Sequence, residues 1–90
     1  MIEQEAKETK YLMRKSGIIN ACNGDLFQAR RIMEIKKHEI IISIALVEAS
    51  LAIAKRENLI ETITHNTSIL QELNEDREFC ERFETETNNA

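Results

Sequence analysis

The stretch NACNGDLFQARRIMEI, residues 20–35, decides how the chain divides into helices. Gly occurs only at positions 17 and 24 and Pro is absent, so Asn23-Gly24 is the clearest interruption in a chain rich in helix-forming residues. Gly24 suits the left-handed conformation that closes a helix, and Asp25 suits the N-cap of the next helix. The stretch predicts a helix over residues 3–22, a turn, and a second amphipathic helix over 26–36.

The composition indicates one small helical domain. The 90 residues are 42% hydrophobic and 31% charged, with a formal net charge of −4, a balance that is typical of a folded chain rather than a disordered one. The acidic balance argues against nucleic-acid binding. All basic residues of the first half nevertheless lie within its first 37 positions (Lys7, Lys10, Arg14, Lys15, Arg30, Arg31, Lys36, Lys37).

The longest apolar stretch predicts a buried helix over residues 39–56 rather than a membrane span. HEIIISIALVEASLAIAK has about 15 residues between its charged ends, fewer than the roughly 20 that a membrane helix needs, and Glu48 interrupts it. The charged N-terminus does not resemble a secretory signal peptide, and Cys22 and Cys80 form no closely spaced pair. We therefore expect reduced thiols and a cytoplasmic location.

Two further polar segments bring the expected number of helices to about four. Lys36-Lys37-His38 separates the second helix from the third, and Arg56-Glu57-Asn58 separates the third from a fourth that begins at residue 59, with Asn58 as its cap. Phe79 and Phe83 extend the last helix over residues 75–83. The sequence predicts a single helical domain over residues 1–84 and a disordered polar tail over 85–90.

The two expected helix starts, Asp25 and Asn58, lie 33 positions apart. Shifting the first helical pair by 33 places small residues on small ones, as Gly17 on Ser50, and apolar residues on apolar ones, as Ile18 on Leu51. A period of about 33–34 with two helices per unit is typical of tetratricopeptide-like arrays. The expected fold is all-α, with two degenerate tetratricopeptide-like helical hairpins and a C-terminal helical extension. An ordinary four-helix arrangement is the alternative.

The run NGDLFQARRI resembles the turn and second helix of a tetratricopeptide repeat, with Gly17, Gly24 and Ala29 on the family's small-residue positions. The second copy departs from that pattern, since Glu57 replaces the turn Gly and Thr62 replaces the Ala, and the aromatic positions are missing. In size, acidic balance and this run followed by an apolar helix, the chain is similar to the tetratricopeptide-like chaperones of type III secretion needle subunits. The resemblance implies a cytosolic, virulence-associated bacterial chaperone that works beside a small helical co-chaperone and holds the needle subunit monomeric.

The repeat alignment also predicts a concave binding face on the first helix of each repeat. Seven of the eight side chains that line it are apolar or aromatic, which favours an amphipathic helix of a partner as the ligand. In the alternative, the same side chains close on each other or on segment 75–83 as ordinary core. The predicted lining is Tyr11, Arg14, Ile18, Ala21, Ile44, Val47, Leu51 and Ala54.

The sequence carries no catalytic signature. His38 and His65 have no neighbours at metal-ligand spacing, the two cysteines have no identifiable base, and there is no Gly-rich phosphate loop. We expect neither enzymatic activity nor a cofactor or metal. The favoured function is a chaperone or adaptor that binds a protein helix in a hetero-oligomer. The alternatives are a phage- or plasmid-type regulator that binds a transcription or replication protein, or DNA through the basic residues, and a homodimeric helical protein.

Overall fold

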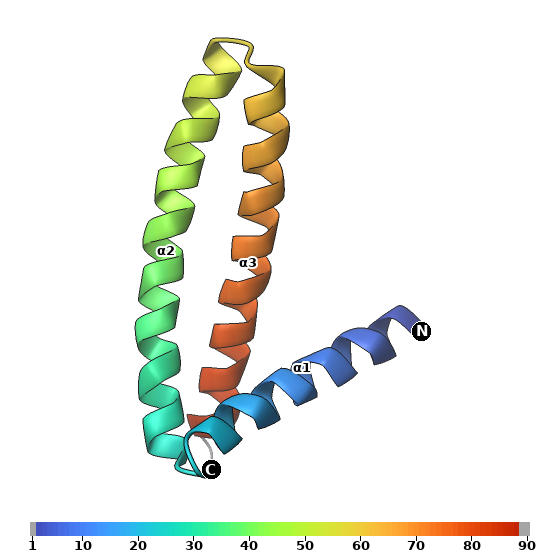
Figure 1. Cartoon of the computed structure of the whole chain (residues 1–90), viewed down its shortest axis with the longest axis vertical. Coiled ribbons are helices and arrows are strands. Elements are labelled where there is room, and N and C mark those ends of the chain that lie inside the picture. Colours follow the sequence, from blue (N-terminus) through green and yellow to red (C-terminus); the bar gives the residue numbers. More distant parts are fainter. Residues whose placement is uncertain (1, 89–90) are drawn as a thin grey trace.

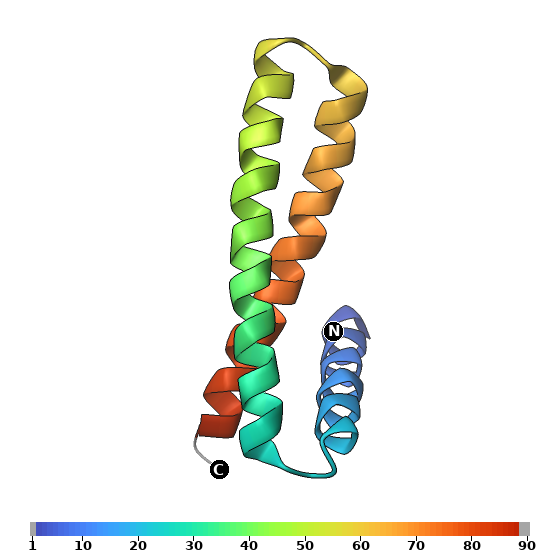
Figure 2. The same ribbon diagram turned by 60° about the vertical axis from the view of Figure 1, so that its left-hand side comes forward.

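The structure, a computed structural model, describes residues 2–88 and consists there of three helices, with no strand. They are α1 (Ile2–Ala21), α2 (Leu26–Arg56) and α3 (Ile60–Asn88). α2 and α3 form a long antiparallel hairpin, and α1 crosses it at the end where α2 begins and α3 finishes (Figures 1 and 2). The molecule is elongated, with extents of 48 × 32 × 20 Å. The all-α prediction is confirmed.

The predicted helix break at residues 36–38 is wrong, and the arrangement of four helices in two hairpins is not confirmed. α2 continues without interruption through this segment. The Nζ atom of Lys37 lies 2.7 Å from a carboxylate oxygen of Glu84 on α3, and His38 Nδ1 lies 2.8 Å from the Glu34 carbonyl oxygen one turn earlier. Polar side chains alone do not end a helix, because the backbone ladder stays intact unless Gly, Pro or a capping group interrupts it.

The two turns, residues 22–25 and 57–59, share a left-handed Asn and the same closing hydrogen bond, although only the first turn has a second residue, Gly24, at positive φ. Asn23 and Asn58 both adopt the left-handed conformation, with φ of 55° and 58°. In each turn the amide of the next residue donates a hydrogen bond to the carbonyl five positions earlier, at 2.9 Å. This is the Schellman arrangement, which satisfies the last carbonyl groups of a helix. Asn is one of the few residues that adopt this conformation readily.

The cap prediction is confirmed at the first turn and wrong at the second. A carboxylate oxygen of Asp25 accepts a hydrogen bond from the Gln28 amide at 3.1 Å, as expected for the N-cap of α2. Asn58 does not cap α3. It closes α2, and α3 begins two residues later, at Ile60. The 33-residue spacing therefore joins a helix start to a helix end.

The two glycines differ in backbone conformation, which gives a paired prediction. Gly17 lies inside α1, and a Cβ added there would meet no atom within 4 Å, whereas Gly24 has a φ of +81°. Gly17→Ala should raise the free energy of unfolding by about 0.5–1 kcal/mol, because alanine restricts the unfolded chain and suits a helix. Gly24→Ala should lower it by about 1 kcal/mol, because alanine is strained at positive φ.

Urea denaturation followed by circular dichroism measures both effects. A destabilising Gly17→Ala would mean that a neighbour packs closely on this position, as the tetratricopeptide alignment requires. Equal effects of the two substitutions would contradict the backbone geometry of the first turn.

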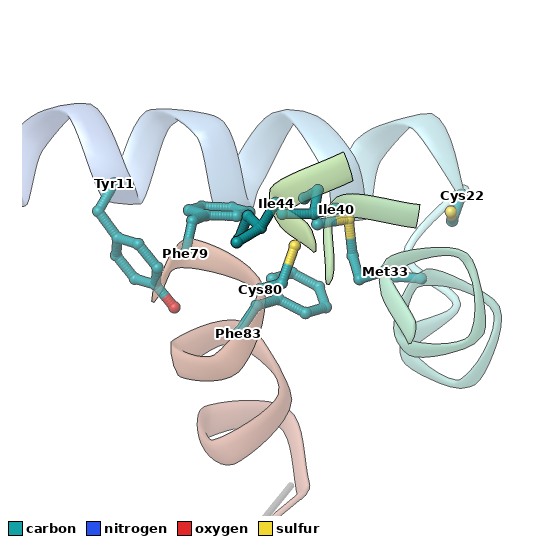
Figure 3. Packing of buried hydrophobic residues seen from close by; sticks show 9 residues of the cluster. Tyr11, Cys22, Met33, Ile40, Ile44, Phe79, Cys80 and Phe83 are labelled. Atoms are coloured by element: carbon teal, nitrogen blue, oxygen red, sulfur yellow. The ribbon is translucent and has the colours of Figure 1, made fainter. Parts of the chain in front are cut away.

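The core lies at the end of the hairpin that α1 crosses, and all three helices contribute to it (Figure 3). Phe79, Cys80 and Phe83 of α3 enter between α1 and α2, and Phe83 is completely buried. The helical extension predicted from Phe79 and Phe83 is thus confirmed as part of α3. The core side chains are Tyr11, Cys22, Ala29, Met33, Ile40, Ile44, Phe79, Cys80 and Phe83.

The tail predicted for residues 85–90 is helical as far as Asn88, and positions 89–90 lie outside the described residues. Thr87 is buried, and its hydroxyl donates a hydrogen bond of 2.7 Å to the Phe83 carbonyl one turn earlier. This bond satisfies the hydroxyl locally, so a polar residue can follow the aromatic residues into the core. Among the helices described, none is long and apolar enough to cross a membrane.

Candidate interaction surface

The side chains predicted to line a binding face are distributed between the core and the surface. Tyr11 and Ile44 lie in the core beside Phe79, and Ile18 packs against the same cluster. These three positions therefore agree with the alternative expectation, in which the side chains pack against segment 75–83 as ordinary core. Ala54 is buried farther along α2, Val47 and Leu51 are half-buried, and Arg14 and Ala21 are exposed.

Arg14 is exposed but engaged with α3. Its Nη1 atom donates a hydrogen bond of 3.0 Å to Asp76, and its guanidinium carbon lies 4.1 Å from the centre of the Phe79 ring. Arg14 thus helps to hold α1 on the hairpin.

A cluster of charged and hydrogen-bonded side chains joins α1 to the end of α3. The Tyr11 hydroxyl and the Lys15 ammonium group donate to the same carboxylate oxygen of Glu86, at 2.7 and 2.8 Å. Arg82 donates to both carboxylate oxygens of Glu8, at 2.6 and 2.8 Å, and to the second oxygen of Glu86, at 3.1 Å. Its guanidinium carbon lies 3.6 Å from the centre of the Tyr11 ring. The cluster binds the two helices together at their crossing.

The electrostatics of this cluster fit a structural role. Hydrogen bonds from Lys15 and Tyr11 lower the pKa of Glu86 to about 2, and the bond from Arg82 lowers the pKa of Glu8. Burial, followed by the bond to Glu86, raises the pKa of Tyr11. At neutral pH both carboxylates are ionised and the tyrosine is neutral, so no group in the cluster is poised to exchange a proton.

The remaining groups to consider are possible metal ligands and the two cysteines. Residues 2–88 contain no cluster of three His, Cys, Asp or Glu side chains that could hold a metal ion. Cys22 and Cys80 are free and buried, and burial raises the pKa of the Cys80 thiol, which disfavours the reactive thiolate. A surface hollow beside the α1–α3 cluster is lined by polar and charged side chains (Gln4, Glu5, Lys7, Glu8, Arg82).

An apolar stripe runs along the side of α2 that is turned away from the core. Positions 32, 35, 39, 42, 46, 49 and 53 follow one another in alternating steps of three and four residues, the heptad spacing of a coiled-coil face. All but Glu39 are apolar. Ile35, Ile42 and Leu46 are 59%, 62% and 67% exposed, and Ile32 and Ile53 are both 47% exposed. We call these seven residues (Ile32, Ile35, Glu39, Ile42, Leu46, Ala49, Ile53) the α2 seam.

The residues that flank the C-terminal half of the α2 seam are small. On the helical geometry, Ser43 and Ser50 lie along one side and Ala45 and Ala52 along the other. Small flanking residues allow another helix to approach closely, as in tightly packed helix pairs. Between positions 42 and 53, Glu48 is the single charged residue, and it lies off the seam. The surface is therefore apolar, with small side chains along both flanks.

The sequence signal for this surface is the helix expected over residues 39–56, which is apolar nearly all round. We expected one side of residues 39–56 to face the core and the other a partner, but the repeat alignment assigned the binding role to the face that includes Ile44. The expected break at residues 36–38 prevented the α2 seam from being recognised in the sequence. It becomes recognisable only when residues 26–56 are one continuous helix, because the heptad spacing runs through that segment.

Comparisons with known proteins assign no role to this surface. No protein-family model matches the chain, and neither the curated proteins nor the solved structures gave a match.

Proposed function

We propose that this protein is a small adaptor or chaperone whose α2 seam binds an amphipathic helix of a protein partner. The observation that carries the proposal is the line of five large, exposed apolar side chains at heptad spacing. Contiguous exposed apolar surface marks an interaction site, because water contact with it is unfavourable. A straight apolar stripe on a helix fits a second helix that presents residues at i, i+3, i+4 and i+7.

The partner in this proposal is a protein rather than a nucleic acid. Several basic side chains of the first half of the chain are already paired with carboxylates of α3: Arg14 with Asp76, Lys15 with Glu86 and Lys37 with Glu84. These pairs reduce the positive potential that DNA binding requires. The net charge of −4 acts in the same direction.

A cytoplasmic chaperone of a type III secretion needle subunit is the specific form of this proposal. Covering an amphipathic helix of such a subunit would prevent its self-assembly, and a co-chaperone could cover a second helix. The support is the similarity in size, acidic balance and the run at residues 23–35. Buried Ala29 agrees with the tetratricopeptide alignment, whereas the open space around Gly17 speaks against close packing there.

Binding of a helical probe tests the general proposal. A fluorescein-labelled designed peptide with leucines at heptad spacing should bind the purified chain saturably in fluorescence anisotropy. Leu46→Glu, which places a charge in the middle of the α2 seam, should weaken binding at least tenfold. Met13→Glu is the matched control, since Met13 of α1 is 72% exposed and lies off the seam. It should leave binding unchanged.

The same assay with a purified needle subunit tests the specific form. Retention of the subunit as a soluble complex that Leu46→Glu abolishes would support the needle-chaperone role. Binding of the designed peptide without any effect on the subunit would leave an adaptor for another helix. Equal peptide binding by the wild type and Leu46→Glu would overturn the proposal that the α2 seam is the binding surface.

A further inference from the structure

The charges at the two ends of the α2 seam indicate what can cover it in the free protein. A second copy of α2 is one candidate, since two heptad stripes of equal length fit each other. In a parallel pair Glu39 would face its own counterpart, and Arg31 would lie beside Lys36 of the other copy. Both contacts bring like charges together, so the parallel arrangement is unfavourable.

An antiparallel pair places opposite charges together at both ends. With the two-fold axis beside positions 47 and 48, Glu39 lies opposite Arg56 of the second copy, and Lys36 lies beside its Glu57. The symmetry repeats each contact once. Within the part of the chain that the structure describes, none of these four charged side chains takes part in an internal ion pair. They are exposed and free to form pairs between copies.

The same register brings apolar side chains together along the middle of the stripe. Leu46 lies opposite Ala49 of the second copy, and Ile42 lies opposite Ile53. On the flanks, small residues oppose small residues, with Ser43 beside Ser50 and Ala45 beside Ala52. The Leu46–Ala49 pairs place a large side chain on a small one, which lets the two helices interdigitate and excludes water from the apolar surface. No other charged side chain falls within this contact between positions 40 and 54, apart from Glu48 off the seam.

From this complementarity of charge and size we infer that the free protein is a homodimer in which the α2 seams of two copies pack antiparallel. The inference rests on the proposed role of the α2 seam as a helix-binding surface and assigns its occupant when no partner is present. The dimer covers the seam from Glu39 to Ile53 and leaves Ile32 and Ile35 beyond the overlap. A partner helix binds by displacing the second copy. Partner affinity therefore decreases as the concentration of the chain itself increases.

Sedimentation equilibrium of the full chain tests the inference. The wild type should be a dimer at micromolar concentration, and Leu46→Glu should raise the dimer dissociation constant roughly a hundredfold or more, because it buries two carboxylates in the contact. Met13→Glu on α1 should sediment as the wild type does. Circular dichroism confirms that each variant remains helical, as expected for substitutions at exposed positions.

Charge reversal tests the orientation. Glu39→Arg and Arg56→Glu should each weaken the dimer roughly tenfold, because each creates two like-charge contacts, and the double variant E39R/R56E should restore wild-type affinity. A parallel dimer would show no such restoration. If the wild type is monomeric at tens of micromolar as well as after 100-fold dilution, the inference is overturned. A double variant that dimerises as weakly as the single variants also overturns it.

The two proposals fail in different ways. If the wild type is monomeric but still binds the designed peptide through Leu46, the dimer proposal fails and the helix-binding proposal stands. A dimer that Leu46→Glu dissociates, but that never releases a subunit to the peptide, would keep the dimer and remove that function.

Discussion

Phe83→Ala should lower the free energy of unfolding by about 3–5 kcal/mol, the range for removing a fully buried phenyl ring. Phe83 is 0% exposed and is the largest completely buried side chain among residues 2–88. Its ring centre lies 6.1 Å from that of Phe79. This end of the hairpin holds nearly all of the core, so no other part of the core can compensate for the lost contacts or for the cavity that the ring leaves. Urea denaturation at one fixed protein concentration measures the effect.

Phe27→Ala is the matched control, because it makes the same change at a position that is 71% exposed. It should alter the free energy of unfolding by no more than about 0.5 kcal/mol. Equal effects of the two substitutions would mean that the end of α3 is not packed between α1 and α2 in solution. The fixed concentration is necessary because dimerisation would itself add to the apparent stability.

The parts of the fold that were predictable from the sequence depend on local chemistry. The first turn could be located because Asn23 and Gly24 tolerate positive φ, and Asp25 carries a side chain that can accept the Gln28 amide. These preferences act within a few residues and need no knowledge of the rest of the chain. The same local chemistry led to an incorrect assignment at Asn58, because Asn serves equally well at the start and at the end of a helix.

The direction in which α2 faces could not be predicted in this way. The helix carries two apolar stripes, one through Met33, Ile40 and Ile44 and the other through Ile42 and Leu46. Periodicity detects both stripes but does not choose between them. The choice is made by the place where the aromatic side chains of α3 pack, a contact between segments distant in sequence. The candidate site is therefore the apolar stripe of α2 that is not buried in the core.

Local polarity was equally misleading at the predicted break and at the predicted tail. Lys37 occurs in a run of polar residues, yet it lies in mid-helix and pairs with Glu84 of α3. Thr87 belongs to a polar segment, yet it is buried behind Phe83. The Lys37 ammonium group is stabilised by a carboxylate that the chain brings near only after it folds, and the Thr87 hydroxyl by the Phe83 carbonyl one turn earlier in its own helix. A sequence pattern records the polarity but not the partner.

Tyr11→Ala should detach α1 from the hairpin and lower the free energy of unfolding by about 3 kcal/mol. The Tyr11 ring packs 5.2 Å from the Phe79 ring, centre to centre, and lies under the Arg82 guanidinium group. Tyr11 is the one buried side chain of α1, so it carries much of the docking. Hydrogen exchange should show amides of α1 losing protection, while the middle of α2 and α3 remains protected in the residual hairpin.

Tyr11→Phe separates the two contributions of this side chain. It keeps the ring against Phe79 and Arg82 and removes only the hydroxyl that donates to Glu86, so it should cost about 1 kcal/mol, and α1 should stay protected. If Tyr11→Phe destabilises as much as Tyr11→Ala, the hydrogen bond to Glu86 rather than ring packing holds α1 in place. Since the α2 seam lies on the opposite side of α2 from the core, both variants should leave its helix-binding affinity unchanged, which would make α1 a stabiliser of the hairpin rather than part of the binding surface.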